Sequence, residues 1–281
     1  ETPVELSVIG FGGILIASSE QKYANRLVAQ AIERGVNYFD VAPTYGDAEI
    51  KLGPALEPYR KDVFLACKTT QRQRPEAEKE FNQSLERLRT DHFDLYQLHG
   101  LVDVEKDLDP VFEKDGVLDM LLERKRAGQI RFIGFSAHSV ETALTTLDRY
   151  QFDSVLFPVN FGCYYGGSFG PQVIQKAQKQ GAARLALKAL ALQHWKEGDP
   201  RREKYGKCWY EPILEPGLAA KSLRWTLSQP VTAAIPPGEE DLFWLAVDIA
   251  SMPMETIPGD TAELETLARS LNVIFRAQET A

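Results

Sequence analysis

Eight short apolar segments, separated by amphipathic stretches, constrain the fold of this chain more than any other feature of its sequence. They cover residues 6–13, 36–42, 63–69, 93–100, 130–137, 154–160, 184–190 and 231–236. Most are nearly continuous apolar runs, as expected for parallel strands that are covered on both faces. Helical patterns follow many of them, at residues 22–34, 75–89, 117–127, 139–149, 171–180 and 214–228.

The alternation of strands and helices predicts one parallel sheet, because no Gly/Ser-rich linker divides the chain. Right-handed crossovers then make a closed (β/α)8 barrel, a TIM barrel, the natural arrangement. A doubly wound open sheet is the alternative, and it needs a division into domains that the sequence does not show. We expect a single domain over residues 1–281, with the core barrel at about 6–250 and a helical extension at about 251–281.

Three segments depart from the regular spacing. Residues 100–115 are a polar loop after the fourth predicted strand, and residues 191–213 are a loop after the seventh. Both loops would lie on the C-terminal face, where barrel active sites form. The aromatic content of the second favours an ordered cover over a substrate, and a packed surface excursion is an equally weighted alternative. Residues 260–271 predict an extra C-terminal helix that opens on a carboxylate cap.

Composition excludes several classes of function. The net charge of −8 argues against a dedicated nucleic-acid binder and a polybasic membrane binder. The three cysteines form no CxxC pair, so we expect neither a zinc site, an iron–sulfur cluster nor a disulfide scaffold. No apolar run reaches about 18 residues, and we expect no membrane span. We expect a cytoplasmic monomer or small homo-oligomer, although the chain begins at Glu1 and an earlier targeting segment stays an open alternative.

Polar side chains stand at the ends of three consecutive predicted strands. Asp40 and Tyr45 follow the second strand, Lys68 ends the third and His99 ends the fourth. Each has an ordinary interpretation: a turn cap for Asp40, a rim aromatic for Tyr45, a solvent-reaching chain for Lys68 and a loop histidine for His99. In a barrel, however, these strand ends are neighbours around the mouth.

Taken together, the four side chains have a joint chemical meaning. A carboxylate beside Lys68 keeps the ammonium charged, and the ammonium lowers the pKa of a nearby phenol such as Tyr45. A free tyrosine titrates near pH ~10 and needs that help to act as an acid near neutrality. His99 would orient a carbonyl oxygen. The sequence therefore predicts a site that protonates a carbonyl oxygen while another group delivers hydride to the carbon.

These segments resemble the aldo-keto reductase family. "GVNYFDVAPTYG" followed by "E" is similar to its first signature, with Asp40 and Tyr45 at the family's Asp and catalytic Tyr. "RKDVFLACKT" and "FDLYQLHG" place Lys68 and His99 at its lysine and histidine, and "GQIRFIGFSAHS" resembles the segment whose serine, here Ser136, contacts the nicotinamide amide. The "IGFGG" turn resembles the turn beside the cofactor. The similarity runs from about residue 6 to about residue 238.

The resemblance implies an NAD(P)(H)-dependent oxidoreductase that reduces an aldehyde or ketone, or oxidises the corresponding alcohol or sugar. Tyr45 would be the general acid/base, Lys68 with Asp40 would tune it, and His99 would orient the carbonyl. The implied cofactor contacts are Gly12, Gly13, Asp40, Ser136, Lys188, Pro236, Gly238 and Glu239. For Lys188 the resemblance suggests the cofactor phosphates, and a side chain that points to solvent is the alternative.

The sequence departs from the family pattern around the cofactor. Pro158 falls where many members carry a Gln, and Leu187 lies near the place of a stacking Tyr. After the eighth strand, "IPPGEEDLFWLAVD" offers carboxylates and no basic residue for a 2′-phosphate. This favours NAD(H), but a distant basic residue can compensate and the acids can serve as a helix N-terminus. The choice between NAD(H) and NADP(H) therefore stays open.

The substrate contacts are less constrained than the catalytic residues. Candidates beside Tyr45 and His99 are His138, Tyr164 and Trp195, in a pocket suited to a sugar or an aromatic aldehyde. His138 can instead cap the next helix, and the two aromatic residues can instead be core. Two other functions stay as alternatives. The chain can be a cofactor-binding regulatory module with little turnover, or a lyase that uses Lys68 as a Schiff base.

Overall fold

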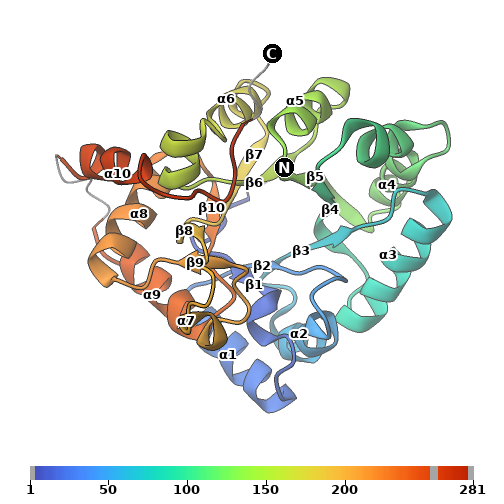
Figure 1. Cartoon of the computed structure of the whole chain (residues 1–281). Helices are drawn as coiled ribbons and strands as arrows, with labels where there is room; N and C mark the ends of the chain where they lie inside the picture. The colour runs from blue at the N-terminus through green and yellow to red at the C-terminus, as the bar shows by residue number, and fades with distance from the viewer. Residues whose placement is uncertain (1–3, 254–258, 278–281) are drawn as a thin grey trace.

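Eight parallel strands form a barrel in the computed structural model, which describes residues 4–253 and 259–277. The strands are β1 (Phe11–Gly12), β2 (Tyr38–Asp40), β3 (Phe64–Thr69), β4 (Phe93–Leu101), β5 (Ile130–Ala137), β6 (Ser154–Pro158), β7 (Ala183–Leu187) and β10 (Ala233–Ile235). They pair in this order, and a parallel bridge between Ile9 and Ala234 joins the first strand to the last (Figure 1). The predicted (β/α)8 barrel is confirmed.

Eight helices surround the strands as an outer ring. They are α1 (Gln21–Glu33), α2 (Ala48–Leu56), α3 (Arg74–Leu88), α4 (Val117–Arg126), α5 (Val140–Arg149), α6 (Pro171–Lys179), α8 (Pro216–Ser228) and α9 (Glu240–Ala250). The helical segments predicted from the sequence omit α2 and α9. Gly53 and Pro54 interrupt the pattern of α2, and α9 is apolar on most of its surface, so neither shows a clear amphipathic period. None of the helices among the described residues is long and apolar enough to cross a membrane.

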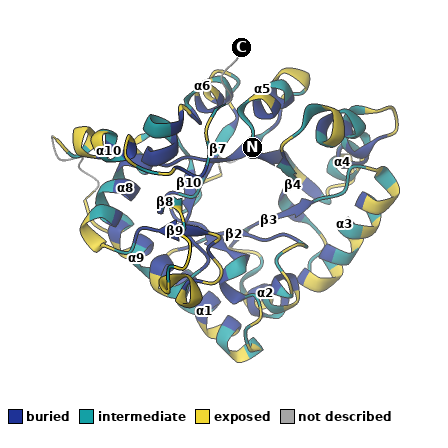
Figure 2. Ribbon diagram, in the orientation of Figure 1, coloured by how far each residue is buried: buried dark blue, intermediate teal, exposed yellow. Residues whose placement is uncertain are grey.

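Side chains at alternate positions of the strands pack into two separate hydrophobic cores, one inside the barrel and one between the strands and the helices. One set of side chains points into the barrel and packs there: Tyr38, Ala66, Leu95, Leu156, Leu185, Ala233 and Ile235. The residues between them, such as Phe39, Cys67 and Phe157, point outward and pack against the helices. Figure 2 shows the strands buried and the outer faces of the helices exposed. This two-sided burial explains why the strands are nearly continuous apolar runs.

The two predicted loops contain regular structure. After β4 lie one π-helical turn, η3 (Val104–Leu108), and one 3-10 turn, η4 (Asp109–Phe112). The segment 191–213 is not a simple loop. Strands β8 (Ala191–His194) and β9 (Tyr210–Pro212) pair antiparallel, and α7 (Arg201–Lys204) lies between them. Across this unpredicted pair of strands, Gln193 Nε2 donates to Glu211 Oε2 at 2.9 Å.

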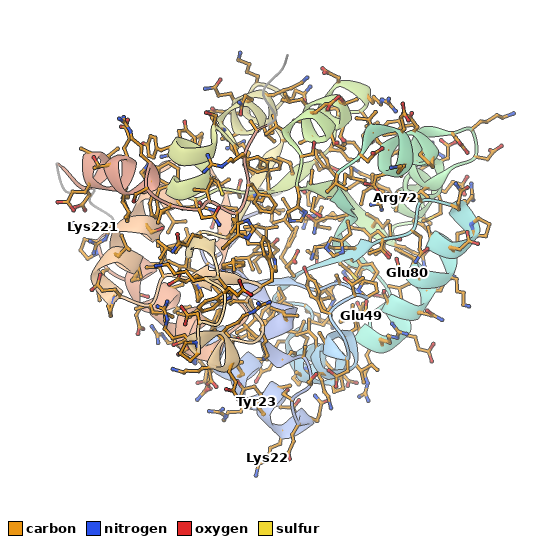
Figure 3. The ribbon with its side chains drawn as sticks, in the orientation of Figure 1. Lys22, Tyr23, Glu49, Arg72, Glu80 and Lys221 are labelled. Carbon is orange, nitrogen blue, oxygen red and sulfur yellow. The ribbon has the colours of Figure 1, made fainter. Side chains whose placement is uncertain are left out.

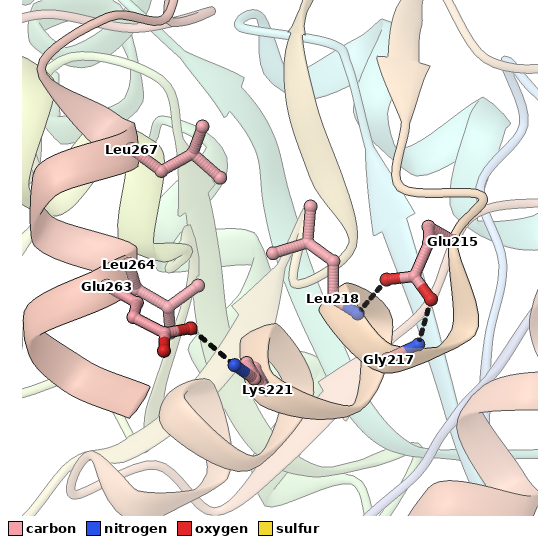
Figure 4. A pocket seen from close by; sticks show the side chains of 7 residues that line it. All are labelled: Glu215, Gly217, Leu218, Lys221, Glu263, Leu264 and Leu267. Carbon is pink, nitrogen blue, oxygen red and sulfur yellow. Dashed lines mark hydrogen bonds and ion pairs between the residues drawn. The ribbon is translucent and has the colours of Figure 1, made fainter. Parts of the chain in front are cut away.

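The predicted extra helix is present as α10 (Asp260–Ala268), but its predicted cap is wrong. Gly259 occupies the cap position and no side chain caps the helix. Asp260 instead lies 3.4 Å from the Lys221 ammonium on α8, and Glu263 pairs with the same ammonium (Figure 4). Leu264 and Leu267 face α8 beside these pairs in Figure 4. The Asp260 carboxylate therefore helps to hold α10 against α8.

A close helix contact makes Gly53 a test of the packing between α2 and α3. A Cβ at Gly53 would lie 2.2 Å from the carbonyl oxygen of Arg87 and 3.0 Å from the Leu88 backbone. Glycine-to-alanine changes inside a helix usually stabilise by about 1 kcal/mol. Here we expect Gly53→Ala to lower the free energy of unfolding by about 1–3 kcal/mol, because the helices must separate.

Urea denaturation measures this change. Lys22→Ala, at an exposed position of α1 that Figure 3 labels, is the control and should change the free energy of unfolding by less than about 0.5 kcal/mol. A Gly53→Ala variant as stable as the wild type would show that the two helices adjust at no cost.

Candidate active site

The four predicted catalytic side chains come together at the C-terminal end of the barrel. Asp40 ends β2, Lys68 lies near the end of β3, and His99 lies near the end of β4. Tyr45 follows β2 in the turn that precedes α2. Tyr38 and Asp40 lie two residues apart and share the inward face of β2, and Lys68 has the same inward parity as Ala66 on β3. Strand parity therefore directs Asp40 and Lys68 into the barrel.

Lys68 and Asp40 form a buried ion pair. The Lys68 ammonium is fully buried, contacts Asp40 Oδ1 and donates to the carbonyl oxygen of Val41 at 3.1 Å. The second oxygen of Asp40 accepts from Gln97 Nε2 at 3.1 Å and from the Tyr38 hydroxyl at 3.3 Å. Both oxygens of the carboxylate are thus hydrogen-bonded, which a buried charge requires.

Tyr38 and Gln97 belong to the site, although neither was predicted from the sequence. Each lies two residues before a predicted catalytic residue, Tyr38 before Asp40 and Gln97 before His99. Because side chains two apart on a strand share a face, this spacing was a usable signal. A glutamine inside an otherwise apolar strand was a second one, since buried polar groups need partners.

The Lys68 ammonium stays charged in spite of its burial. Burial alone lowers the pKa of Lys68, but the Asp40 carboxylate and the Tyr45 phenol outweigh it, and the pKa of Lys68 lies above its ordinary value. This direction agrees with the sequence-based prediction. The site therefore holds a fixed positive charge beneath Tyr45.

The net pKa of Tyr45 differs from the prediction. Its ring lies 5.0 Å from the Lys68 ammonium, and the nearby charge does lower the pKa of Tyr45 as expected. Burial has the larger effect, however, and the pKa of Tyr45 is raised overall. The expectation of a net lowering is wrong because it left out the desolvation of the phenolate. At neutral pH the phenol is accordingly protonated and can donate its proton.

His99 stands beside Tyr45 as a neutral imidazole. The two rings meet edge to face, with their centroids 5.9 Å apart. Burial, together with the positive charge of Lys68, lowers the pKa of His99 to about 3. Its Nδ1 is buried and has no hydrogen-bond partner among the described residues. A buried nitrogen without a partner is suited to a ligand atom.

Two charged side chains fix the strand ends around these groups. Arg72 donates from Nη2 to the carbonyl oxygen of His99 at 2.7 Å and also contacts Asp107 at 3.4 Å. Glu80 on α3 accepts from the Thr69 hydroxyl at 2.6 Å and from the Thr70 amide at 2.9 Å. Figure 3 labels both Arg72 and Glu80 near the ends of β3 and β4. The ends of β3 and β4 are therefore held from outside the barrel.

A cavity of about 260 Å³ opens at this end of the barrel. It is lined by Gly12, Ile14, Asp40, Tyr45, His99, Ser136, His138, Leu156, Leu187, Lys188, Lys207, Trp209, Tyr210, Ile235, Pro236, Pro237 and Gly238. Most of the predicted cofactor residues are therefore on its wall. His138 faces the cavity, whereas Ser139 caps α5 by accepting from the Thr142 amide.

Several predicted contacts lie away from the cavity wall. Tyr164 packs against Trp225 of α8, with ring centroids 5.1 Å apart. Trp195 donates to the carbonyl oxygen of Cys208 at 2.8 Å. Both residues lie in the segment 191–213, which contains β8 and β9 and is called the β8–β9 excursion below. Gly13, Glu239 and Pro158 are also not among the lining residues. Tyr164 and Trp195 therefore pack outside the wall of this cavity, and their predicted substrate roles stay predictions.

The β8–β9 excursion closes one side of the cavity. Lys207 donates from Nζ to the carbonyl oxygen of Leu15 in η1 (Gly13–Ile16) at 2.7 Å, and from its amide to Glu239 Oε1 at 2.9 Å. The Tyr205 hydroxyl donates to Asp241 at 3.2 Å. The carboxylates of Glu239 and Asp241, which follow β10, therefore hold residues 191–213 in place. Trp209 and Tyr210 supply its aromatic face in the cavity.

The cavity has features that suit it to binding a small ligand. Gly238 approaches Ile14 so closely that a Cβ would lie 2.0 Å from Ile14 Cγ2, so the Ile14 side chain would have to move to admit any other residue. Ser136 Oγ accepts from the Gly100 amide at 2.8 Å and keeps its own proton available to an acceptor. The unpartnered Nδ1 of His99 adds a further polar group. Apolar walls with a few convergent polar groups are typical of cofactor sites.

The contribution of the buried ion pair to the free energy of unfolding can be measured by comparing single and double variants. Asp40→Asn leaves the Lys68 ammonium buried without a carboxylate, and we expect the free energy of unfolding to fall by about 3–5 kcal/mol. The double variant Asp40→Asn/Lys68→Met removes the unpaired charge and should be more stable than the single variant. Urea denaturation at neutral pH measures both. A double variant that loses at least as much stability as the sum of the single changes would contradict this account.

The lowered pKa of His99 predicts a pH-dependent stability. Between its folded pKa of about 3 and its ordinary value of 6.5, the unfolded chain binds a proton that the folded protein does not. The stability from neutral His99 is therefore fully present above pH 6.5 and is lost as the pH falls. From pH 7 to pH 5, this residue should cost about 2 kcal/mol. His99→Asn should remove that part of the loss in paired urea titrations, and an unchanged loss would contradict the assignment.

Comparison with known proteins identifies the family of this chain. The model of the Aldo/keto reductase family matches residues 8–193. Aldo-keto reductase YhdN of Bacillus subtilis (strain 168) is 31% identical over 160 residues, which cover 50% of this chain and 46% of that protein. L-galactose dehydrogenase of Arabidopsis thaliana is 29% identical over 181 residues, which cover 59% of this chain and 55% of that protein. The chain spans about half the length of the curated relatives it matches.

Solved structures share the fold over nearly the whole chain. The aldo-keto reductase AKR11C1 from Bacillus halodurans, in its holo form, superposes with a TM-score of 0.73 and 20% identity. The match covers 95% of this chain and 94% of that one. The family model, which matches more than half of the chain, confirms the resemblance seen in the sequence. This chain belongs to the aldo/keto reductase family.

Proposed function

We propose that this protein is a nicotinamide-dependent oxidoreductase that reduces aldehydes or ketones, or oxidises the corresponding alcohols. One observation carries the proposal: the protonated Tyr45 phenol faces a cavity, with a fully buried ammonium 5.0 Å from its ring and a neutral His99 beside it. This arrangement supplies a proton at one point of a small cavity. A carbonyl oxygen is the acceptor that such a donor serves.

Reduction requires two transfers, one to each end of the C=O bond. A nicotinamide cofactor, when bound, supplies the hydride that adds to the carbonyl carbon, and it accepts hydride in the oxidation of an alcohol. Tyr45 Oη gives its proton to the carbonyl oxygen as the C=O π bond breaks. The product is an alcohol and the residue left behind is a phenolate, which regains a proton from water.

Lys68 makes the proton transfer easier at the moment it occurs. The phenolate that forms on Tyr45 is stabilised by the ammonium, whose positive charge is already in place. Asp40 keeps that ammonium charged and oriented, and Gln97 and Tyr38 fix Asp40 in turn. The cost of burying the phenolate, which raises the pKa of Tyr45 in the resting site, is thereby partly offset.

His99 orients the carbonyl. A neutral imidazole can donate one hydrogen bond, and Nε2 is the donor when Nδ1 carries no proton. Because the pKa of His99 is lowered to about 3, the ring stays neutral over the physiological pH range and adds no competing positive charge. A hydrogen bond from His99 to the carbonyl oxygen would place that oxygen next to Tyr45.

The residues that would hold the cofactor lie around the same cavity. Gly12, Ser136, Pro236 and Gly238 form its wall on the side of β1, β5 and β10, and Asp40 lies at its base. Gly13 and Glu239 support that wall from behind, since Gly13 packs on Val41 and Glu239 holds Lys207. Both NAD(H) and NADP(H) are compatible with these residues. Lys207 is a basic residue on the wall that comes from the β8–β9 excursion and not from the segment after β10.

The proton-donor role of Tyr45 predicts a defect in the chemical step. We expect Tyr45→Phe to lower kcat for aldehyde reduction by about 10²–10⁴-fold, because the variant keeps the ring and loses the proton. Binding of NADH and NADPH, followed by quenching of tryptophan fluorescence, should stay within about threefold of the wild type. Oxidation of the reduced cofactor at 340 nm, with a panel of aldehydes and sugars, measures the rate.

A matched variant controls for the loss of a tyrosine hydroxyl. The Tyr150 ring lies against Phe152 and is not part of the cavity wall. The variant Tyr150→Phe should therefore retain the wild-type rate. Tight cofactor binding without turnover in the wild type would instead identify a regulatory module. Trapping of Lys68 by borohydride with a carbonyl compound would identify a Schiff-base enzyme.

A further inference from the structure

The backbone of β4 is irregular at the point where it carries His99. Leu98 pairs with Phe135 of β5 and Leu101 pairs with Ala137, so β4 has one more residue than β5 over this stretch. An extra residue of this kind disrupts the local ladder of hydrogen bonds and re-aims a side chain. Strand pairing therefore does not by itself fix the peptide group that follows His99, and other groups must hold it.

Two side chains hold this peptide group, one at each end. Arg72 Nη2 donates to the carbonyl oxygen of His99 at 2.7 Å. The amide of Gly100, which belongs to the same peptide group, donates to Ser136 Oγ at 2.8 Å. Gly100 has a φ of +67°, and glycine adopts positive and negative φ about equally readily. The residue therefore adds no steric restraint of its own, and the two hydrogen bonds set the orientation of the peptide group.

Arg72 is itself held by two further contacts. Its Nη1 donates to the carbonyl oxygen of Thr70 at 3.1 Å, and its Nε lies 3.4 Å from Asp107 Oδ1. A planar guanidinium presents several donors in a fixed geometry, so one side chain can reach all these acceptors at once. Arg72 is therefore a rigid connection between the turn after β3 and the peptide group after His99.

Asp107 extends this connection to the loop after β4. Its Oδ2 accepts from the amides of Val102 and Asp103, each at 3.0 Å, while its Oδ1 faces Arg72. The guanidinium thus joins three backbone segments that lie around the end of β4. Since these segments hold one another, the backbone that carries His99 has little freedom to shift.

The imidazole of His99 depends on that backbone for its position. Its Nδ1 has no hydrogen-bond partner among the residues that the structure describes, and its ring meets the Tyr45 ring edge to face at 5.9 Å. A ring held in this way follows the backbone to which it is attached. A displacement of about 1 Å in a group that orients a substrate can lower a rate by about 10²-fold.

We propose that Arg72 is a positioning residue for the reduction. By binding the carbonyl oxygen of His99, it sets the place of the imidazole that orients the substrate carbonyl beside Tyr45. Arg72 is not among the residues that line the cavity, so its effect passes through His99. The inference rests on the proposed oxidoreductase function and adds to it a residue that touches neither substrate nor cofactor.

A double-variant cycle tests whether Arg72 acts through His99, with the aldehyde that the wild type reduces fastest. We expect Arg72→Met to lower kcat/KM by about tenfold or more, while binding of NADH and NADPH stays within about threefold of the wild type. In a His99→Ala background, the same change should lower kcat/KM by less than about threefold, because the residue that Arg72 positions is absent. An equal loss in both backgrounds would overturn the proposal.

Two further variants control this cycle. Arg74→Met removes an arginine from the same segment that binds Glu78 and Glu123 and does not contact His99, and it should keep kcat/KM within about threefold. Arg72→Lys keeps the positive charge but loses the planar fork, so it should show a smaller loss that again disappears in the His99→Ala background. This second variant decides the question if Arg72→Met does not fold, and an equal loss in both backgrounds would again contradict the inference.

Nuclear magnetic resonance of the histidine rings tests the inference without turnover. The chain has four histidines, and asparagine variants assign their ring signals: His92, His99, His138 and His194. Arg72→Met and Arg72→Lys should both move the ring nitrogen signals of His99, and Arg74→Met should leave them in place. Because Arg72→Lys keeps the charge, its shift reports the position of the ring.

The two kinds of failure are distinguishable. Unmoved His99 signals in a folded Arg72→Met protein would overturn the positioning role, whatever the activity of the wild type. A wild type that reduces no aldehyde, with His99 signals that do move in both Arg72 variants, would count against the proposed function and leave the contact between Arg72 and His99 supported.

Discussion

The buried ion pair between Lys68 and Asp40 is the interaction on which the site depends. An ammonium inside a barrel is stable only with a carboxylate, and a buried carboxylate is stable only when its oxygens are hydrogen-bonded. Tyr38 and Gln97 meet that second demand. The result is a polar layer that rests on the apolar interior of the barrel and takes its members from β2, β3 and β4. The same layer fixes the relative positions of three strand ends.

The protonation states of the two residues above this layer follow from competition between burial and charge. Both Tyr45 and His99 are desolvated, and burial favours the neutral form of each. The positive charge of Lys68 lowers the pKa of both residues. It therefore favours the phenolate of Tyr45 and the neutral imidazole of His99. A neutral donor and a neutral orienting group beside a permanent cation suit the protonation of a carbonyl oxygen. The arrangement needs no change of protonation before substrate enters.

Patterns along the strands predicted the barrel and the meeting of Asp40, Tyr45, Lys68 and His99 at one end of it, because strand periodicity and strand ends are local properties of a sequence. Elements without a clean period were missed: α2 contains Gly53 and Pro54, and α9 is apolar on most of its surface. The net pKa of Tyr45 was predicted in the wrong direction, since its burial depends on the surrounding side chains. Asp260 was taken for a cap, although its carboxylate pairs with Lys221, 39 residues earlier in the chain (260 − 221).

The wall of the cavity could not be derived in the same way, because distant segments build it. Lys207 joins the β8–β9 excursion to η1 and to Glu239, so contacts over nearly the whole length of the chain decide where Trp209 and Tyr210 lie. The ion pair and His99, in contrast, come from three consecutive strands, β2, β3 and β4. A family resemblance carried by those strands therefore says more about the proposed chemistry than about the identity of the substrate. The aromatic face of the wall, Trp209 and Tyr210, therefore depends on contacts that no single segment of the sequence contains.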